Sequence, residues 1–225
     1  LRYYGSYAHK GKAYVVTEYC AGRELLSEIL HAGKLTQRRA QAIFREVCEA
    51  LVYLHARGIA HRDLKPENVL IEASTQRVKL IDFGMAKQLP KGLARMSSEV
   101  GTFMYSSPQV DDGKYSSKCD VWSAGIVLHL MLTGEYPFAC ENVQQVLDAK
   151  RDFRLSFDGP LWERVSPAAK DLLRRCMHVS EKQRCSAREA LDHPWLATAG
   201  NDVVLLDSAM VGKLWAYSKD SRLIN

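Results

Sequence analysis

Residues 61–68 read HRDLKPEN and bring charged groups of both signs together in one short stretch. Asp63 supplies a carboxylate that can accept a proton, Lys65 an ammonium that can bind an anion, and Asn68 an amide. The apolar run at 69–71 follows directly. Charges of this kind also occur in surface loops for solubility alone, and an isolated Asp most often caps a turn. The rest of the chain decides between these two interpretations.

Regular elements are predicted on both sides of this stretch. Before it, Thr36 suits a helix N-cap and Gly58 a helix stop. One face of the segment between them is apolar at helical spacing: Ala40, Ile43, Phe44, Val47, Leu51 and Leu54. After it, β-branched runs at 69–71 and 78–81 enclose a polar turn and predict a hairpin. The motif DFG follows at 82–84, so the helix and the hairpin must position both polar stretches.

The remaining chain predicts a small sheet and a helical body. Residues 1–21 read as two short strands joined by a turn with Gly11, a pair that is only marginally stable alone. The segment 119–134 is apolar on nearly every face, so its helix belongs at the centre of a domain, with Asp120 and Gly134 at its ends. Start signals and periodicity predict three further helices: around 141–150, 167–178 after Pro167, and 186–192 after Ser186.

Composition indicates an ordinary globular protein. Of its 225 residues, 47% are hydrophobic and 25% are charged, which is unlike a disordered chain. The formal net charge is only +5, and Lys and Arg are scattered without a dense basic run, so we expect no nucleic-acid partner. No stretch approaches the roughly 18 apolar residues that span a bilayer, so we expect no membrane span.

Cysteine usage and the first residue indicate the cellular context. The six cysteines form no CxxC pair, which favours buried free thiols in a reducing compartment over structural zinc. No signal-peptide pattern opens the chain, so we expect a cytoplasmic location. Because the first residue is Leu1 and not Met, we expect the chain to be part of a longer protein.

The polar stretches form a longer series along the chain. HRDLKPEN, DFG, GTFMYSSPQ, DVWSAGI and a late Arg184 follow one another in that order. This series resembles the large lobe of the eukaryotic protein kinases, and the resemblance covers essentially residues 1–196. It implies an α+β, protein-kinase-like fold with a mainly helical C-lobe and a two-strand remnant of the N-lobe sheet. The implied boundaries are 1–21 for the N-lobe remnant and hinge, 22–196 for the C-lobe, and 197–225 for a C-terminal tail or the start of a regulatory junction helix.

The resemblance assigns a role to each polar residue. Asp63 matches the catalytic aspartate that accepts the proton of the substrate hydroxyl, and Lys65 matches the residue that steadies the γ-phosphate. Asn68 and Asp82 match the two magnesium ligands, both with the oxygen donors that this hard cation prefers. The implied activity is a serine/threonine protein kinase, with ATP and Mg²⁺ as cofactors and protein Ser or Thr side chains as substrates. DLKPEN with Lys65, and Thr102, favour this class over the tyrosine kinases.

The same resemblance implies a nucleotide pocket. Glu18 and Cys20 would offer backbone groups to adenine, Glu24 would reach the ribose, and Leu70 would form the pocket floor. Thr17 matches the gatekeeper. Thr17 and Leu70 also suit ordinary core positions, so their ligand roles depend on the resemblance alone.

Other residues near the motifs serve alignment in this family. His61 and Phe83 favour packing over chemistry, and Asp120 resembles a buried aspartate that ties the central helix to the catalytic loop. Arg62 resembles the arginine of kinases whose activation segment is positioned by a negative charge. The candidate partners in that segment are Ser97, Ser98, Glu99 and Thr102. Ser97 and Ser98 also suit plain loop positions.

A narrower resemblance points to the calcium-dependent and calmodulin-dependent kinases. It is carried by the residues around GTFMYSSPQ, by 112–138 and by 184–196, and by the tail 203–225, which resembles a junction helix leading to EF-hands. The amphipathic stretch 203–219 suits a calmodulin or EF-hand regulatory partner, or else a helix packed on the lobe. The chain has no EF-hand loop, so calcium would be sensed elsewhere.

Two departures from the family pattern leave a rival function open. No Gly-rich loop, VAIK-type lysine or paired glutamate precedes the strands at 3–19, so this chain alone would lack the roof of an ATP site. SPQ stands at 107–109 in place of APE, and Gln109 can hydrogen bond to Arg184 without neutralising it, from which we expect a looser activation segment. The rival is a catalytically inactive pseudokinase or a binding or scaffold module. The intact Asp63, Asn68 and Asp82 favour the enzyme.

Overall fold

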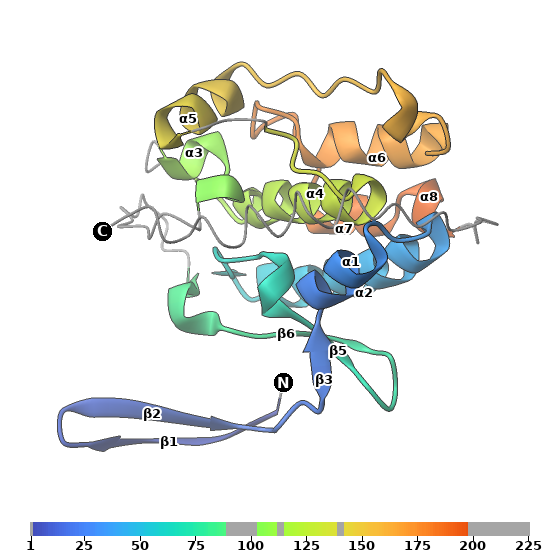
Figure 1. The fold of residues 1–225 in the computed structure, drawn as a ribbon. Coiled ribbons are helices and arrows are strands. Elements are labelled where there is room, and N and C mark those ends of the chain that lie inside the picture. Colours follow the sequence, from blue (N-terminus) through green and yellow to red (C-terminus); the bar gives the residue numbers. More distant parts are fainter. Residues whose placement is uncertain (1, 89–102, 112–114, 139–141, 198–225) are drawn as a thin grey trace.

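The structure is a computed structural model that describes residues 2–88, 103–111, 115–138 and 142–197. Helices are its main regular elements, and small antiparallel sheets lie at one side of the helical body (Figure 1). This arrangement agrees with the mainly helical lobe and the two-strand remnant that the sequence predicts. The tail after Ala197, the candidates Ser97, Ser98, Glu99 and Thr102, and Cys140 lie outside the described residues.

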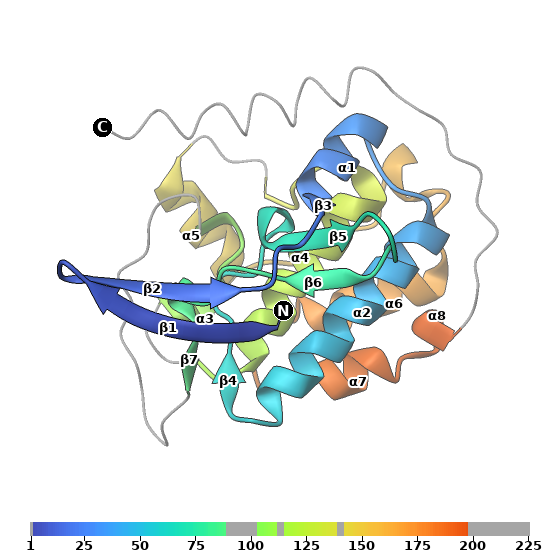
Figure 2. The same ribbon diagram turned by 90° about the horizontal axis from the view of Figure 1, so that it is seen from below.

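The N-terminal hairpin projects away from the helices (Figures 1 and 2). Strands β1 (Tyr3–His9) and β2 (Lys12–Thr17) pair antiparallel, as predicted. The two turn residues, Lys10 and Gly11, have φ angles of 47° and 73°, the left-handed geometry that suits a tight hairpin turn. In the part of the chain that the structure describes, the two strands form a two-stranded sheet of their own.

A second sheet carries the polar motifs. Its strand order is β3 (Gly22–Glu24), β5 (Val69–Glu72) and β6 (Val78–Leu80), so the predicted hairpin at 69–81 is confirmed. Strand β3 was not predicted. A Cβ at Gly22 would lie 2.2 Å from the Ile71 carbonyl oxygen, so the close pairing of β3 with β5 requires glycine there. Two short strands, β4 (Ile59–Ala60) and β7 (Lys87–Gln88), form a third small sheet.

Helix α2 (Gln37–His55) precedes the loop that carries HRDLKPEN at 61–68, hereafter the catalytic-type loop. The Thr36 hydroxyl accepts a hydrogen bond from Arg39 N at 3.1 Å, which confirms the predicted N-cap. The helix ends at His55, three residues before the left-handed Gly58. All six apolar residues predicted to share one face are buried: Ala40, Ile43, Phe44, Val47, Leu51 and Leu54.

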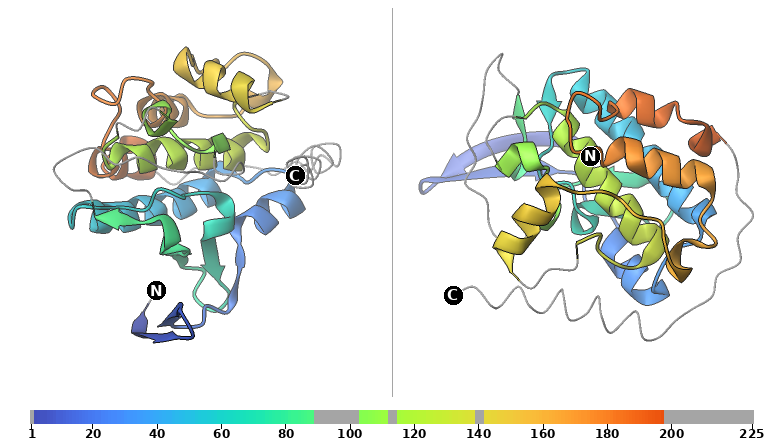
Figure 3. Two further views of the ribbon diagram at one scale, coloured as in Figure 1. Left: turned by 90° about the vertical axis from the view of Figure 1, so that its left-hand side faces the viewer. Right: turned by 90° about the horizontal axis from the view of Figure 1, so that it is seen from above.

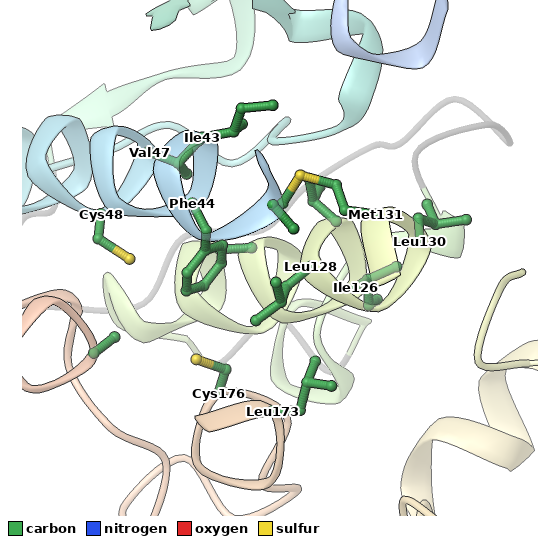
Figure 4. Packing of buried hydrophobic residues seen from close by; sticks show 14 of the residues in the cluster. Ile43, Phe44, Val47, Cys48, Ile126, Leu128, Leu130, Met131, Leu173 and Cys176 are labelled. Atoms are coloured by element: carbon green, nitrogen blue, oxygen red, sulfur yellow. The ribbon is translucent and has the colours of Figure 1, made fainter. Parts of the chain in front are cut away.

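Helix α4 (Lys118–Thr133) lies at the centre of the helical body, as its uniformly apolar sequence predicts (Figure 3). It ends at Gly134, whose φ of 77° suits a left-handed C-cap. It packs between α2 on one side and α6 (Pro167–Cys176) on the other. Figure 4 shows Phe44 of α2 and Leu173 of α6 pointing toward Leu128 of α4. Truncating one such buried side chain to Ala typically costs about 2–5 kcal/mol.

The remaining helices cover this core. They are α1 (Leu25–Ala32), α3 (Pro108–Asp111), α5 (Val143–Arg151), α7 (Ala187–Leu191) and α8 (Pro194–Ala197), with 3-10 turns at Pro66–Asn68, Phe83–Met85 and Pro160–Trp162. Helices α5, α6 and α7 confirm the three predicted segments, and Ser186 forms a complete capping box with Glu189. In the described ranges, no helix combines the length and the apolar character needed to cross a bilayer.

Candidate active site

The loop between β4 and β5 brings three of the predicted site residues together. Asp63 is 7% exposed, and the Lys65 ammonium lies 3.1 Å from its Oδ2 atom. Asn68 donates from Nδ2 to the Asp63 carbonyl oxygen at 2.7 Å and to Oδ2 at 2.9 Å. One loop therefore holds a carboxylate, a cation and an amide in direct contact, as the spacing in HRDLKPEN predicts.

Asp120 fixes the backbone of this loop from the first turn of α4. Its Oδ1 accepts from Arg62 N at 2.8 Å and its Oδ2 from His61 N at 2.9 Å, while His55 Nε2 lies 2.8 Å from Oδ2. Burial by itself raises the pKa of Asp120, but His55 and the two amides outweigh it, so the pKa lies below its usual value. The hydrogen bonds from these two backbone amides to Asp120 also stabilise the left-handed backbone of Arg62, which has φ 68°.

His61 links the loop to the segment that carries Asp82. Its Nδ1 accepts from Asp63 N at 3.3 Å, so the proton resides on Nε2, which donates to the Ile81 carbonyl oxygen at 3.0 Å. Its ring also packs against Phe83 with centroids 4.9 Å apart. His61 is fully buried, which agrees with the packing role that the sequence favours for it, whereas Phe83 is 42% exposed and contacts the His61 ring.

Asp82 directly follows Ile81, whose backbone is tied to the loop at both ends. Ile81 N donates to the Asn68 carbonyl oxygen at 3.0 Å, in addition to the bond from His61. Asp82 itself is exposed in a left-handed conformation, and its Oδ1 accepts from Gly84 N at 3.2 Å. Asp82 thus directly follows a residue whose backbone is hydrogen-bonded to that of Asn68.

The donor set of Asn68 and Asp82 fits a hard divalent cation. The Asn68 nitrogen is turned toward Asp63, which leaves its Oδ1 as the atom available to a ligand. Asp82 adds a carboxylate on an exposed turn. Amide and carboxylate oxygens are the protein ligands that Mg²⁺ prefers.

The residues expected around a nucleotide lie on the sheet side of this loop. Leu70 is half-buried on β5, and its partner in the register is the exposed Glu24 of β3. Glu18 pairs with the Lys79 ammonium at 3.1 Å, which lowers the pKa of the Glu18 carboxyl. Its backbone N–H donates to the Arg2 carbonyl oxygen at 2.8 Å, while Cys20 is half-buried. Glu24 and Leu70 are therefore cross-strand neighbours on β3 and β5. The ion pair of Glu18 with Lys79 connects the segment after β2 to β6.

Arg62 points to a contact that sequence reasoning missed. Its Nε donates to the Met85 carbonyl oxygen at 2.5 Å, and its Nη1 donates to the Tyr115 hydroxyl at 2.5 Å. Tyr115 carries no motif signal of its own, because the contact joins segments far apart in the chain. Arg62 thereby connects the catalytic-type loop to the turn after Asp82.

Glu67 is a second residue that the sequence reading passed over. Its Oε2 is buried and has no hydrogen-bond partner among the residues that the structure describes. Burial raises the pKa of its carboxyl, and the charges of Glu24 and Asp63 add to this effect, while Lys65 opposes it. The available signal in the sequence was an acidic residue between Lys65 and Asn68, inside PEN.

Gln109 and Arg184 meet as the sequence predicts. Arg184 is 1% exposed and donates from Nη2 to Gln109 Oε1 at 2.6 Å, and burial lowers the pKa of its guanidinium to about 10. Gln109 Nε2 donates to the Val179 carbonyl oxygen at 2.8 Å. Arg184 also donates to the carbonyl oxygens of His178 and Lys118, both at 3.0 Å. The amide at 109 uses both of its ends, which a carboxylate would not.

Comparisons with known proteins agree with this geometry. The profile described as protein kinase domain matches residues 1–196. Similar curated proteins include calcium-dependent protein kinase 3 of Plasmodium yoelii yoelii, 39% identical over 81% of this chain and 34% of that protein. Serine/threonine-protein kinase PEPKR2 of Arabidopsis thaliana is 37% identical over 81% of this chain and 38% of that protein. Calcium-dependent protein kinase 9 of Arabidopsis thaliana is 33% identical over 99% of this chain and 42% of that protein. The chain thus spans well under half the length of these relatives.

Proposed function

This chain belongs to the protein kinase domain family, and we propose that the protein containing it transfers the γ-phosphate of ATP to Ser or Thr hydroxyls of protein substrates. The observation that carries the proposal is the contact network of Asp63, Lys65 and Asn68, tied to Asp82 through Ile81. A loop that served only solubility would not bury a carboxylate to 7% exposure beside an ammonium and an amide. Phosphoryl transfer needs these groups because it depends on positioning and on charge stabilisation.

Asp63 is the proton acceptor in this proposal. Its carboxylate is oriented by the Asn68 amide and by the Lys65 ammonium, so it is held in one rotamer before substrate binds. General-base assistance of this kind typically contributes about 10²–10⁴-fold to rate. Lys65, 3.1 Å from Oδ2, also places a positive charge where a transferring phosphoryl group would approach the acceptor.

Asn68 and Asp82 would hold magnesium, with their oxygen atoms as ligands. The bound ion would neutralise charge on the phosphates. Glu18, Cys20, Glu24 and Leu70 would line the nucleotide side, Glu18 and Cys20 through backbone groups. Lys79 of β6 forms ion pairs with Glu18 at 3.1 Å and with Glu72 of β5 at 2.9 Å, which link the segment after β2 to this sheet.

Calcium regulation is the finer part of the proposal. Two of the relatives named above are calcium-dependent protein kinases. We propose that the amphipathic stretch 203–219 contacts a calmodulin or EF-hand regulatory segment. The match to calcium-dependent protein kinase 9 of Arabidopsis thaliana extends over 99% of this chain and therefore includes this stretch.

The test is phosphate transfer by the full-length protein to peptides that differ only in a Ser, Thr or Tyr acceptor. The account predicts labelling of the Ser and Thr peptides with Mg²⁺-ATP, and loss of labelling in Asp63→Asn. Asp192→Asn is the matched control, because Asp192 is an exposed carboxylate at the C-cap of α7, 3.9 Å from the Arg188 guanidinium. No labelling by the wild type would favour the pseudokinase or binding module instead, and full labelling by Asp63→Asn would refute the role of Asp63 as proton acceptor.

A further inference from the structure

Lys150 on α5 is a buried lysine whose amine is used entirely inside the protein. It is 0% exposed, and its Nζ donates to the Phe103 carbonyl oxygen at 2.7 Å, to the Ser106 carbonyl oxygen at 3.2 Å and to Ser106 Oγ at 3.0 Å. Burying an ammonium is costly unless hydrogen bonds replace its water. All three of these acceptors belong to residues 103–106, hereafter the 103–106 segment.

Two other elements hold the same segment. Ser123 of α4 donates from Oγ to the Tyr105 carbonyl oxygen at 2.8 Å, and the hydroxyls of Tyr105 and Tyr136 are hydrogen-bonded to each other. The carbonyl oxygens of Phe103, Tyr105 and Ser106 are therefore all fixed by side chains from elsewhere in the fold. Helix α5 reaches the segment because it lies beside α3, which begins at Pro108 (Figures 1 and 2).

The 103–106 segment lies next to the loop that carries Asp63. On α4, Ser123 is three residues after Asp120, so the two side chains share one face of the helix. Asp120 holds the amides of His61 and Arg62, while Ser123 holds the Tyr105 carbonyl. Burial raises the pKa of the Tyr105 phenol, and the nearby charges of Glu67 and Asp63 raise it further. The 103–106 segment therefore lies beside the loop that carries Asp63, where a chain whose hydroxyl reaches Asp63 can contact it.

We propose that Lys150 is a positioning residue for the protein substrate, because its amine sets the path of the 103–106 segment against which the residues flanking the acceptor hydroxyl lie. This inference rests on the proposed kinase function and adds a residue 68 positions after Asp82. Lys150 does not touch the nucleotide side, where Glu24 and Leu70 lie on β3 and β5. Its loss should therefore affect protein substrate and ATP differently.

A purely structural role would give a different result. Lys118 provides the matched comparison, because its Nζ also donates to backbone carbonyl oxygens, those of Arg184 at 2.5 Å and Lys182 at 3.4 Å. It makes the same type of bond without contacting the 103–106 segment. Lys150→Met and Lys118→Met each remove one amine that binds carbonyls, so a general loss of stability appears in both.

The experiment is steady-state kinetics of the full-length protein, with KM measured separately for a Ser peptide and for ATP. Lys150→Met is expected to raise the peptide KM by about tenfold or more, since small displacements of positioning groups have effects of that size. The ATP KM should change by less than about twofold. Ser106→Ala, which removes one acceptor of the amine and keeps the fold, should shift the peptide KM in the same direction by a smaller factor. Lys118→Met should leave the ratio of the two KM values unchanged.

Hydrogen exchange of the same proteins gives a readout that needs no turnover. Lys150→Met should speed amide exchange in residues 103–107, and Lys118→Met should not. An unchanged ratio of KM values, or equal exchange in both variants, overturns the inference. A wild type that transfers no phosphate overturns the proposed function, and the exchange rates then still decide whether Lys150 holds the segment.

Discussion

Asn68 directs its amide nitrogen at Asp63, with donor distances of 2.7 Å to the carbonyl oxygen and 2.9 Å to Oδ2. This contact joins the residue that would accept the proton to a residue that would hold the metal. It also fixes which end of the Asn68 amide faces outward. The two roles are therefore coupled through one side chain, and removing it should affect both.

Asn68→Ala should abolish measurable phosphate transfer and lower the free energy of unfolding by about 1–3 kcal/mol, since buried Asp63 loses two donors. The measurement is denaturant unfolding combined with the transfer assay on the full-length protein. Asn142→Ala is the control, because the Asn142 side chain is exposed and caps α5 by accepting from Gln145 N at 2.9 Å. The control should lose about 1 kcal/mol and keep its transfer rate. Equal transfer by the two variants would contradict the role of Asn68.

Asp120→Asn should lower both stability and transfer. An amide has one acceptor oxygen, so it cannot accept from both His61 N and Arg62 N while also pairing with His55. The cost of leaving a buried amide unpaired is about 1–3 kcal/mol, and the left-handed Arg62 should relax. Thermal unfolding and peptide kinetics check this together. The comparison is Asp171→Asn, which changes the contact of the Asp171 carboxylate on α6 with His193 Nε2 at 2.9 Å. A normal kcat in Asp120→Asn would show that the loop does not need this anchor.

The burial of His129 leads us to expect a loss of folding stability in acid. Burial lowers its pKa to about 4, and its Nδ1–H donates to the Glu135 carbonyl oxygen at 2.8 Å. The unfolded state, with a pKa of about 6.5, binds a proton that the folded state excludes, so this contribution is complete above about pH 6.5 and falls as the pH approaches 4. The loss over that window is about 3 kcal/mol. Unfolding free energies of His129→Gln should show a flatter pH dependence than those of the wild type or of the exposed-site variant His9→Gln. Parallel curves for all three would refute the assignment.

Gln109→Glu tests whether the missing carboxylate loosens the activation segment. The change would neutralise Arg184 but would lose the donor to the Val179 carbonyl oxygen, now at 2.8 Å. Because a carboxylate would neutralise the buried guanidinium, which the amide cannot do, we expect a net gain of about 1 kcal/mol in stability and a higher transfer rate. Gln183→Glu, at an exposed position, should change neither. Unchanged melting temperature and activity in Gln109→Glu would refute the looser segment.

The sequence predicted the elements that are specified locally. Thr36, Ser186 and Gly134 carry their capping signals in their own residue types, and α2 and α4 show their burial in their apolar patterns. Strand β3 escaped prediction because three residues give no periodicity, and its pairing depends on the Ile71 backbone approaching Gly22.

The contacts within the loop were predictable for the same reason, since Asp63, Lys65 and Asn68 lie within six residues. The contacts of Tyr115 and Lys150 were not. Tyr115 meets Arg62 across 53 positions, and Lys150 meets the Phe103 carbonyl across 47. A buried lysine cannot be distinguished from a surface lysine by its sequence neighbours, and only the packing of α5 assigns it.

The most direct test separates nucleotide binding from phosphate transfer in the full-length protein. Calorimetry with ATP, with and without Mg²⁺, is compared with the single-turnover transfer rate in wild type, Asp63→Asn and Asp82→Asn. The account predicts that Asp63→Asn binds Mg²⁺-ATP like the wild type but transfers at least about 10²-fold more slowly, and that Asp82→Asn loses the part of the affinity that depends on Mg²⁺. Transfer by Asp63→Asn at the wild-type rate, or Mg²⁺-dependent affinity that survives in Asp82→Asn, would contradict the roles assigned to these two carboxylates.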